Sequence, residues 1–133
     1  MRYLKNDHLL QMFDFIKCLV LVANNKLASS SMICPKIIIW NLENDSIDKK
    51  LIGHTKPANC LVAVSNRNYL ISGYKDKQIR IWDIVSGNVV KILAGHNDEI
   101  NCLAILDDDS NDYKLASGSD DGAILKFGTS KNN

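Results

Sequence analysis

The chain has 133 residues, 46% of them hydrophobic, and a formal net charge of +1. This length and apolar content suit one small folded domain and exclude an extended disordered chain. Because the charges are balanced and no stripe of Lys or Arg runs along the sequence, we expect no nucleic-acid partner. No stretch approaches the ~20 apolar residues that span a bilayer, so we expect no membrane partner either.

Short apolar runs separated by polar breaks predict strands along the chain. The first run, residues 18–22, is followed by small residues at 27–29, by a third run at 37–40 and by a fourth at 50–52. Runs this short, rich in Val and Ile and bounded by Asn, Asp, Gly and Ser, are typical of strands. Paired helices would need ten or more uninterrupted residues, which the sequence does not offer.

This group of four runs returns twice, so the sequence is an internal repeat. His54 and His96 are 42 residues apart, and so are Trp40 and Trp82. The first run of every copy begins at a cysteine, with the same interval: Cys18, Cys60 and Cys102. A period near 42 filled by four short strands predicts an all-β repeat fold.

The motifs inside the second and third copies resemble WD40 repeats. Both copies contain a Gly-His pair, a Ser-Gly pair and an Asp, and their third strands end in Trp-Asp or Phe-Gly. These are Gly53-His54, Ser72-Gly73, Asp76 and Trp82-Asp83 in the second copy and Gly95-His96, Ser117-Gly118, Asp121 and Phe127-Gly128 in the third. The first copy departs from the pattern, because Met12 stands in place of the His and Asn41 follows Trp40.

The resemblance implies an all-β fold, a partial WD40-type β-propeller of about three four-stranded antiparallel blades. We expect blade one at about residues 13–52, blade two at about 55–94 and blade three at about 97–128, in a single repeat region over 1–133. Propellers close with typically 4–8 blades, so this chain alone does not close the ring. Blades one and three should then each show an apolar face to water, which marks an interface.

Two explanations of the open ring are compatible with the sequence. Copy three ends before a fourth strand, and residues 1–11 hold a spare N-terminal strand. In the family the last blade is commonly completed by a strand from the opposite terminus, so two chains would form a six-bladed ring by self-association through open blade edges. The explanation we favour is that the chain is a fragment or truncated form of a larger propeller.

The resemblance also implies a hydrogen-bonded network that locks each blade. A buried network is worth most when complete, and Phe127 has no N–H with which to complete that of blade three. We therefore expect blade two to be the stiffest and blade one the loosest. The expected network residues are His54, Ser72, Asp76 and Trp82 in blade two and His96, Ser117 and Asp121 in blade three.

For function, the resemblance implies a non-catalytic scaffold whose partners are other proteins or peptides. An alternative is the substrate-recognition part of a larger ubiquitin-ligase or signalling protein whose activity lies outside this chain. Family members bind ligands on the face that carries the loops before the first strands and the turns between the second and third strands. On this face we expect Pro57, Asn59, Lys75, Glu99, Asn101 and Asp120, although ordinary solvated loops are the competing explanation.

We expect no catalytic residues, no cofactor and no metal site. The two repeat histidines have framework positions, and no nucleophile or third ligand recurs with them. The acidic insertion at residues 107–112 could suggest calcium, but it has Asp112 where a calcium loop needs Gly, and Gly118 where it needs Glu. A solvated loop is therefore favoured.

The cysteines and the N-terminal sequence indicate a compartment. There is no Cys-x-x-Cys pair, and three of the four cysteines occupy equivalent strand positions, which predicts free thiols in a reducing environment. Residues 16–23 come nearest to a secretory signal core, but Lys17 interrupts them. We therefore expect a cytoplasmic or nuclear location.

Overall fold

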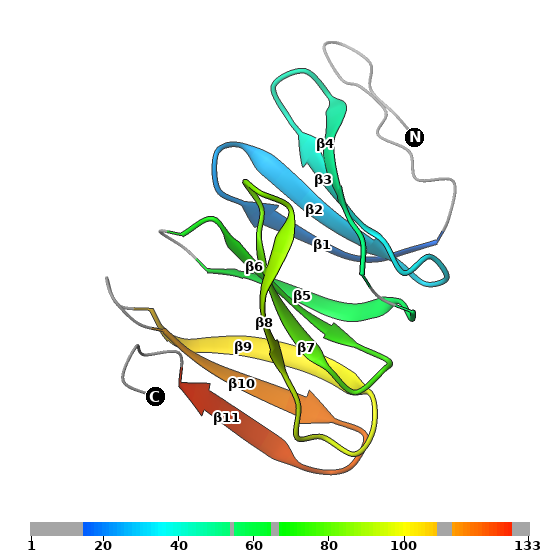
Figure 1. Ribbon diagram of the computed structural model, residues 1–133, viewed down its shortest axis with the longest axis vertical. Helices are drawn as coiled ribbons and strands as arrows, with labels where there is room; N and C mark the ends of the chain where they lie inside the picture. The colour runs from blue at the N-terminus through cyan, green and yellow to red at the C-terminus, as the bar shows by residue number, and fades with distance from the viewer. Residues whose placement is uncertain (1–14, 54, 65–66, 109–112, 129–133) are drawn as a thin grey trace, which may run out of the picture.

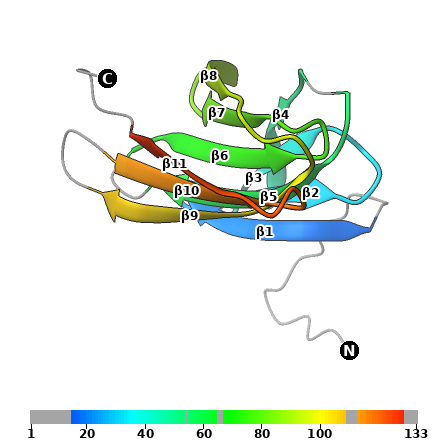
Figure 2. The ribbon, with the colours of Figure 1, turned by 90° about the horizontal axis from the view of Figure 1, so that it is seen from below.

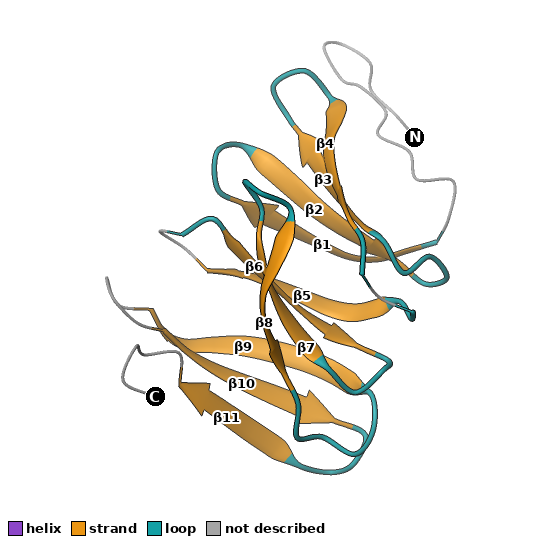
Figure 3. Cartoon of the chain, in the orientation of Figure 1, coloured by secondary structure: helices purple, strands orange, loops and turns teal. Residues whose placement is uncertain are grey.

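The computed structural model describes residues 15–53, 55–64, 67–108 and 113–128. Within them the chain forms three antiparallel sheets built from eleven strands (Figures 1 and 3). These residues contain no helix of the length and apolarity needed to cross a membrane. The expected N-terminal strand at 1–11 and the whole of His54 lie outside the described residues.

Each sheet corresponds to one blade. Blade one has the strand order β1 (Ile16–Val22), β2 (Lys26–Ser31), β3 (Ile37–Asn41) and β4 (Ser46–Leu51). Blade two has β5 (Ala58–Val64), β6 (Tyr69–Tyr74), β7 (Ile79–Asp83) and β8 (Asn88–Leu93). Blade three has β9 (Ile100–Asp108), β10 (Tyr113–Ser119) and β11 (Ile124–Gly128). The predicted all-β class and the open, partial propeller are confirmed. Three strands of blade three are described, and the residues after Gly128 lie outside the described part.

Strands that follow one another in the chain are neighbours in each sheet, so every blade is a simple antiparallel meander. The β1–β2 turn holds Asn24 and Asn25 at φ values of 63° and 58°, a left-handed conformation that Asn tolerates. The β10–β11 turn uses Gly122 at φ 81°, where a side chain would be strained. The repeated turn at this point of blade two instead holds Lys77 at φ 74°. Turn chemistry therefore varies between blades while the meander is kept.

The blades stand side by side with their first strands adjacent, since β5 contacts both β1 and β9 (Figure 1). Figure 2 shows β1 and β9 on one side of the molecule and β4, β7 and β8 on the other. One hydrophobic core lies between blades one and two and includes Ile39, Leu51 and Trp82. A second lies between blades two and three and includes Ile81 and Ile100. Blade two is thus covered on both faces.

The outer blades expose apolar side chains at positions that are buried in blade two, where Leu61, Val64 and Ile79 are the equivalents of Leu19, Leu106 and Ile124. In blade one, Leu19 and Leu21 on the first strand are exposed. In blade three, Leu106 and Ile124 are exposed. These exposed side chains lie on the two blades that have a neighbour on one side only among the described residues.

Candidate functional site

The framework residues predicted for blade three lie together around His96. This residue precedes β9, and its Nδ1 is 3.0 Å from Asp121 Oδ2 while its Nε2 is 2.7 Å from Ser117 Oγ. Because a carboxylate only accepts, the Nδ1–H of His96 donates to Asp121. His96 and Ser117 are both buried, so the chain of contacts ties the loop before β9 to the second strand from inside the protein.

Backbone donors lower the pKa of Asp121. The N–H groups of Asn97 and Ala123 each donate to its carboxylate at 2.8 Å. These two bonds, and then the bond from His96, favour the ionised form and hold the pKa of Asp121 at about 2, against an ordinary value of 3.8. Asp121 therefore acts as an anionic anchor for two separate loops.

In blade two the described part of the predicted network centres on Trp82, Ser72 and Asp76, since His54 lies outside the described residues. The indole N–H of Trp82 donates to Ser72 Oγ at 2.9 Å, and both side chains are buried. Asp76 accepts from the N–H of Gln78 at 3.2 Å and lies 3.6 Å from the guanidinium of Arg80. Burial raises the pKa of Asp76, the opposite direction from Asp121. Arg80 was not predicted, and its i+4 spacing from Asp76 was the available signal.

Blade one keeps one bond of the network in spite of its degenerate motif. The indole N–H of Trp40 donates to Ser29 Oγ at 2.8 Å, as Trp82 does to Ser72. The sequence reasoning missed this bond, although Ser29 ends the same small-residue segment that carries Ser72 and Ser117 in the other copies. The loss of the His and Asp therefore does not remove the Ser–Trp pair.

The loops predicted to bind partners lie next to each other in blades two and three. The N–H of Lys75 donates to the carbonyl of Pro57 at 3.4 Å, and the N–H of Asp120 donates in the same way to the carbonyl of Glu99 at 3.2 Å. Each bond joins the loop before the first strand to the turn between the second and third strands. These loops and turns lie together on the right of Figure 1.

The side chains of this face differ in exposure. Asn101 and Asp120 are exposed, and the Asn101 amide donates to the Asp120 carboxylate. Pro57, Lys75 and Glu99 are half-buried. The remaining predicted residue, Asn59, lies away from solvent.

Asn59 departs from the expectation of a surface residue. Its side chain is only 9% exposed, and its Nδ2 donates to the carbonyl of Ile100 at 2.9 Å. A β-bulge between Ala58 and Cys60 re-aims this side chain toward blade three. The amide is therefore used between blades, because a bulge changes the direction that strand alternation predicts.

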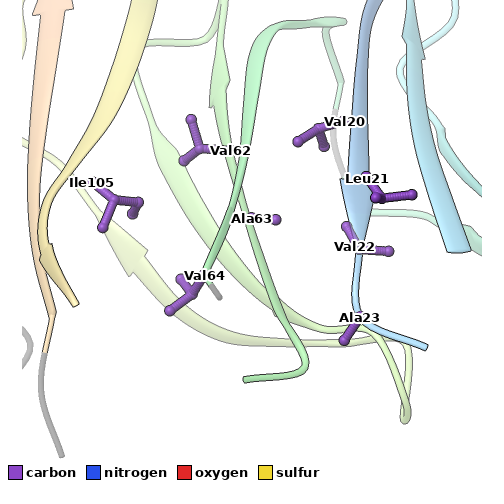
Figure 4. A pocket seen from close by; sticks show the side chains of 8 residues that line it. All are labelled: Val20, Leu21, Val22, Ala23, Val62, Ala63, Val64 and Ile105. Carbon is purple, nitrogen blue, oxygen red and sulfur yellow. The ribbon is translucent and has the colours of Figure 1, made fainter. Parts of the chain in front are cut away.

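The first strands also line an open apolar groove of about 510 Å³ (Figure 4). In Figure 4, Val20 of β1 points toward β5, Ala63 of β5 points toward β1, and Ile105 of β9 points toward Val62 and Val64. None of the lining residues titrates, so the groove has no acid or base for catalysis. Among the described residues, no group of three or more His, Cys, Asp or Glu side chains is placed to hold a metal ion.

Four-stranded antiparallel sheets that pack face to face in succession are the blades of a β-propeller. The sequence profile of the WD40 family, described as WD domain, G-beta repeat, matches residues 46–83 and 87–125. These segments cover more than half of the chain, which belongs to the WD40 family. A comparison with curated proteins finds no match. WD40 domains are typically non-catalytic and mediate interactions between proteins.

The matched segments do not coincide with the blades. The first runs from the start of β4 to the end of β7, and the second from just before β8 into β11. Each sequence repeat thus contributes the last strand of one blade and the first three strands of the next. A repeat of this kind links neighbouring blades covalently, which keeps their faces in contact.

Proposed function

We propose that this chain is a non-catalytic scaffold that holds other proteins or peptides on the loop face of blades two and three. The observation that carries the proposal is the pair of equivalent backbone bonds, from Lys75 to Pro57 and from Asp120 to Glu99. They hold the same two loops together in both blades and present side chains above a buried framework. Loops fixed on a rigid scaffold are the usual site of binding.

The chemistry of this face suggests the kind of ligand. Three sectors follow one another from blade to blade: mainly apolar in the β2–β3 loop, which also exposes Lys36, basic around blade two and acidic around blade three. The residues are Met32 and Ile33 in the first sector, Lys56, Lys75 and Lys77 in the second, and Asp98, Glu99 and Asp120 in the third. A peptide segment with an apolar, an acidic and a basic group in that order would match the surface, because charge complementarity provides specificity.

Substrate recognition within a ubiquitin-ligase or signalling assembly remains a second, narrower form of the same proposal. It would use the same face, with any chemistry supplied by other polypeptides. A cytoplasmic or nuclear setting is supported by the four cysteines, all of which lie in the described residues and none of which forms a disulfide. Burial raises the pKa of Cys60 to about 12, so this thiol is kept in its unreactive form.

We also propose that the three blades work with further blades in a larger ring. The exposed apolar side chains on blades one and three support this, since each side of blade two shows how such a face is covered. Self-association and a longer polypeptide are two ways of supplying the missing blades.

The partner face is tested by the double substitution Lys75→Ala with Glu99→Ala. We expect weaker capture of bound proteins from a native extract, and an unchanged melting temperature, because both side chains sit on loops rather than in the cores. A matched control is Lys50→Ala with Lys91→Ala, two exposed lysines on the fourth strands. Quantitative mass spectrometry would compare proteins captured by each variant.

Two results would contradict the proposal. A fall in melting temperature that matches the loss of capture would assign Lys75 and Glu99 to the folding framework. Loss of capture in the control, with full capture by the loop variant, would move the partner face to the outer strands.

A further inference from the structure

The junction between blades two and three shows how one blade receives the next. Ile100 of blade three lies directly over Gly73 of blade two, because a Cβ built on Gly73 would be 2.5 Å from Ile100 Cγ2 and 2.7 Å from Cys60 Sγ. Only a residue without a side chain leaves room for Ile100 here. The amide of Asn59 then donates to the carbonyl of Ile100 at 2.9 Å. The junction thus has three parts. The space above Gly73 and Cys60, which we call the socket, is filled by Ile100, and the side-chain amide of Asn59 donates a hydrogen bond to the Ile100 carbonyl.

Blade three carries the same socket on its outer face. Cys102 pairs with Gly118 as Cys60 pairs with Gly73, and a Cβ on Gly118 would be 2.7 Å from Cys102 Sγ. Here no isoleucine lies above the glycine. The space is an open pocket of about 170 Å³ lined by Cys102, Leu103, Ala104, Ala116, Ser117, Gly118 and Ile124. Ile124 is 79% exposed beside it.

Asn101 completes the socket. It occupies the bulge of β9 that Asn59 occupies in β5, between Ile100 and Cys102. Its amide donates to Asp120, but an amide nitrogen carries two N–H groups, so a second donor is available to a neighbouring blade.

Blade one carries the part that fits such a socket. Ile16 occupies in β1 the position that Ile100 occupies in β9. Ile16 pairs with Ser31 and Ile100 pairs with Ser119, and a bulge follows each isoleucine. Ile100 is fully buried, whereas Ile16 is 47% exposed. Leu19 on the same strand is exposed as well. Blade one therefore exposes Ile16, which is equivalent to the Ile100 that blade three inserts into blade two.

We propose that blade three of one copy of this chain docks against blade one of a second copy. Ile16 of the second copy enters the socket formed by Gly118 and Cys102, and the amide of Asn101 donates to the carbonyl of Ile16. The contact repeats an interface already present in the molecule, which specifies both its register and its occupant. This docking proposal rests on the proposed larger ring, and it does not involve the loop face proposed to bind partners.

The contact is head to tail, because it joins two different faces. Such contacts produce a closed ring where the rotation closes and a filament where it does not. Lys126 weakens it: this exposed residue pairs with Ala116, whereas the matching residue of blade two is the buried Ile81, paired with Ile71. A charge in an apolar interface costs free energy unless paired, so association should depend on concentration.

Sedimentation velocity of the 133-residue chain across micromolar concentrations tests the proposal. We expect a mass that rises toward multiples of the single chain. Ile16→Asp and Ile124→Asp should each weaken association roughly tenfold or more, because each places a charge in the apolar contact. Lys126→Ile should strengthen association, since it restores the residue type of blade two.

Mixing the two aspartate variants gives the sharpest readout. Each variant retains the face that the other has lost, so the mixture should form a one-to-one pair although neither variant associates alone. Val85→Asp and Val90→Asp, at exposed positions of blade two, are matched controls that should leave association unchanged. Circular dichroism would verify that every variant is folded.

Three results would overturn the proposal. The chain and its Lys126→Ile variant could both stay monomeric throughout the concentration range. Ile16→Asp could self-associate while Ile124→Asp does not, which would indicate a symmetric contact between two copies of blade three. The mixture of variants could fail to pair. None of these results would affect partner capture by the loop face, so the two proposals fail separately.

Discussion

Blade two has a neighbouring blade on each side, whereas blade three has one among the described residues. The burial of their third strands, β7 and β11, differs accordingly. In β7 the four residues Ile79–Trp82 are all buried. In β11 exposed and half-buried residues alternate along the strand. A strand covered on both faces has no solvent side, so even the charged Arg80 of β7 is buried, whereas a strand covered on one face alternates between exposed and covered positions. The burial of a residue in this fold is therefore decided by the neighbouring blade as much as by its own strand.

The pKa values of the equivalent acidic residues in the two blades are shifted in opposite directions. Asp121 receives two backbone N–H bonds and a histidine, and its pKa is lowered to about 2. Asp76 lies beside Arg80 at 3.6 Å, and burial raises its pKa. The same position of the repeat thus favours the charged form where backbone donors converge and disfavours it where desolvation prevails.

The largest expected effect comes from truncating the tryptophan of blade two. Trp82→Ala should lower the free energy of unfolding by about 3–5 kcal/mol, because it removes a fully buried aromatic ring from the core between blades one and two. Trp82→Phe, which removes the donor to Ser72, should cost about 1–3 kcal/mol. Urea unfolding measures both changes.

Phe127→Ala is the matched substitution in blade three and should cost less, since Phe127 is half-buried. An equal cost for Phe127→Ala and Trp82→Ala would show that cover by neighbouring blades does not explain the difference between the two.

A medium effect is expected from adding one methyl group to each socket. Gly73→Ala should destabilise the protein by about 1–3 kcal/mol, because the new Cβ meets both Ile100 and Cys60 in a packed junction. Gly118→Ala should cost less, because the new Cβ meets Cys102 Sγ and no inserted isoleucine. Urea unfolding at concentrations where the chain is monomeric separates the two. Equal losses of unfolding free energy in the two variants would show that contact with the cysteine, and not with the neighbouring blade, causes the destabilisation.

The smallest effect is expected on acidification. The pKa of Asp121 is lower in the folded protein than its ordinary value of 3.8, so its contribution to stability is complete above about pH 4. The contribution should be lost as the pH falls toward about 2. The difference in unfolding free energy between the unmodified chain and Asp121→Asn, measured in urea at a series of pH values, should shrink over this range. Glu43→Gln, at an exposed turn, is the control. A difference that does not vary with pH would remove Asp121 from its anchoring role.

The sequence by itself determined the number of repeats, the all-β class and the WD40 family. These follow from local information, because strand alternation, turn residues and a period of 42 are all properties of residues close together in the chain. The resemblance likewise indicated which residues to examine as the framework: His96, Ser117 and Asp121 do lie in contact. His54 lies outside the described residues, so the full set in blade two stays a prediction.

Only the tertiary structure decided which residues work between blades. Asn59 was expected on the partner face and instead bonds Ile100, and the exposure of Ile16 differs from that of Ile100 although their registers match. Strand pattern alone gives both isoleucines the same environment. The physical reason is that a blade buries its faces against groups from another repeat, some 40 residues away. Their presence or absence cannot be read from the strand that they cover.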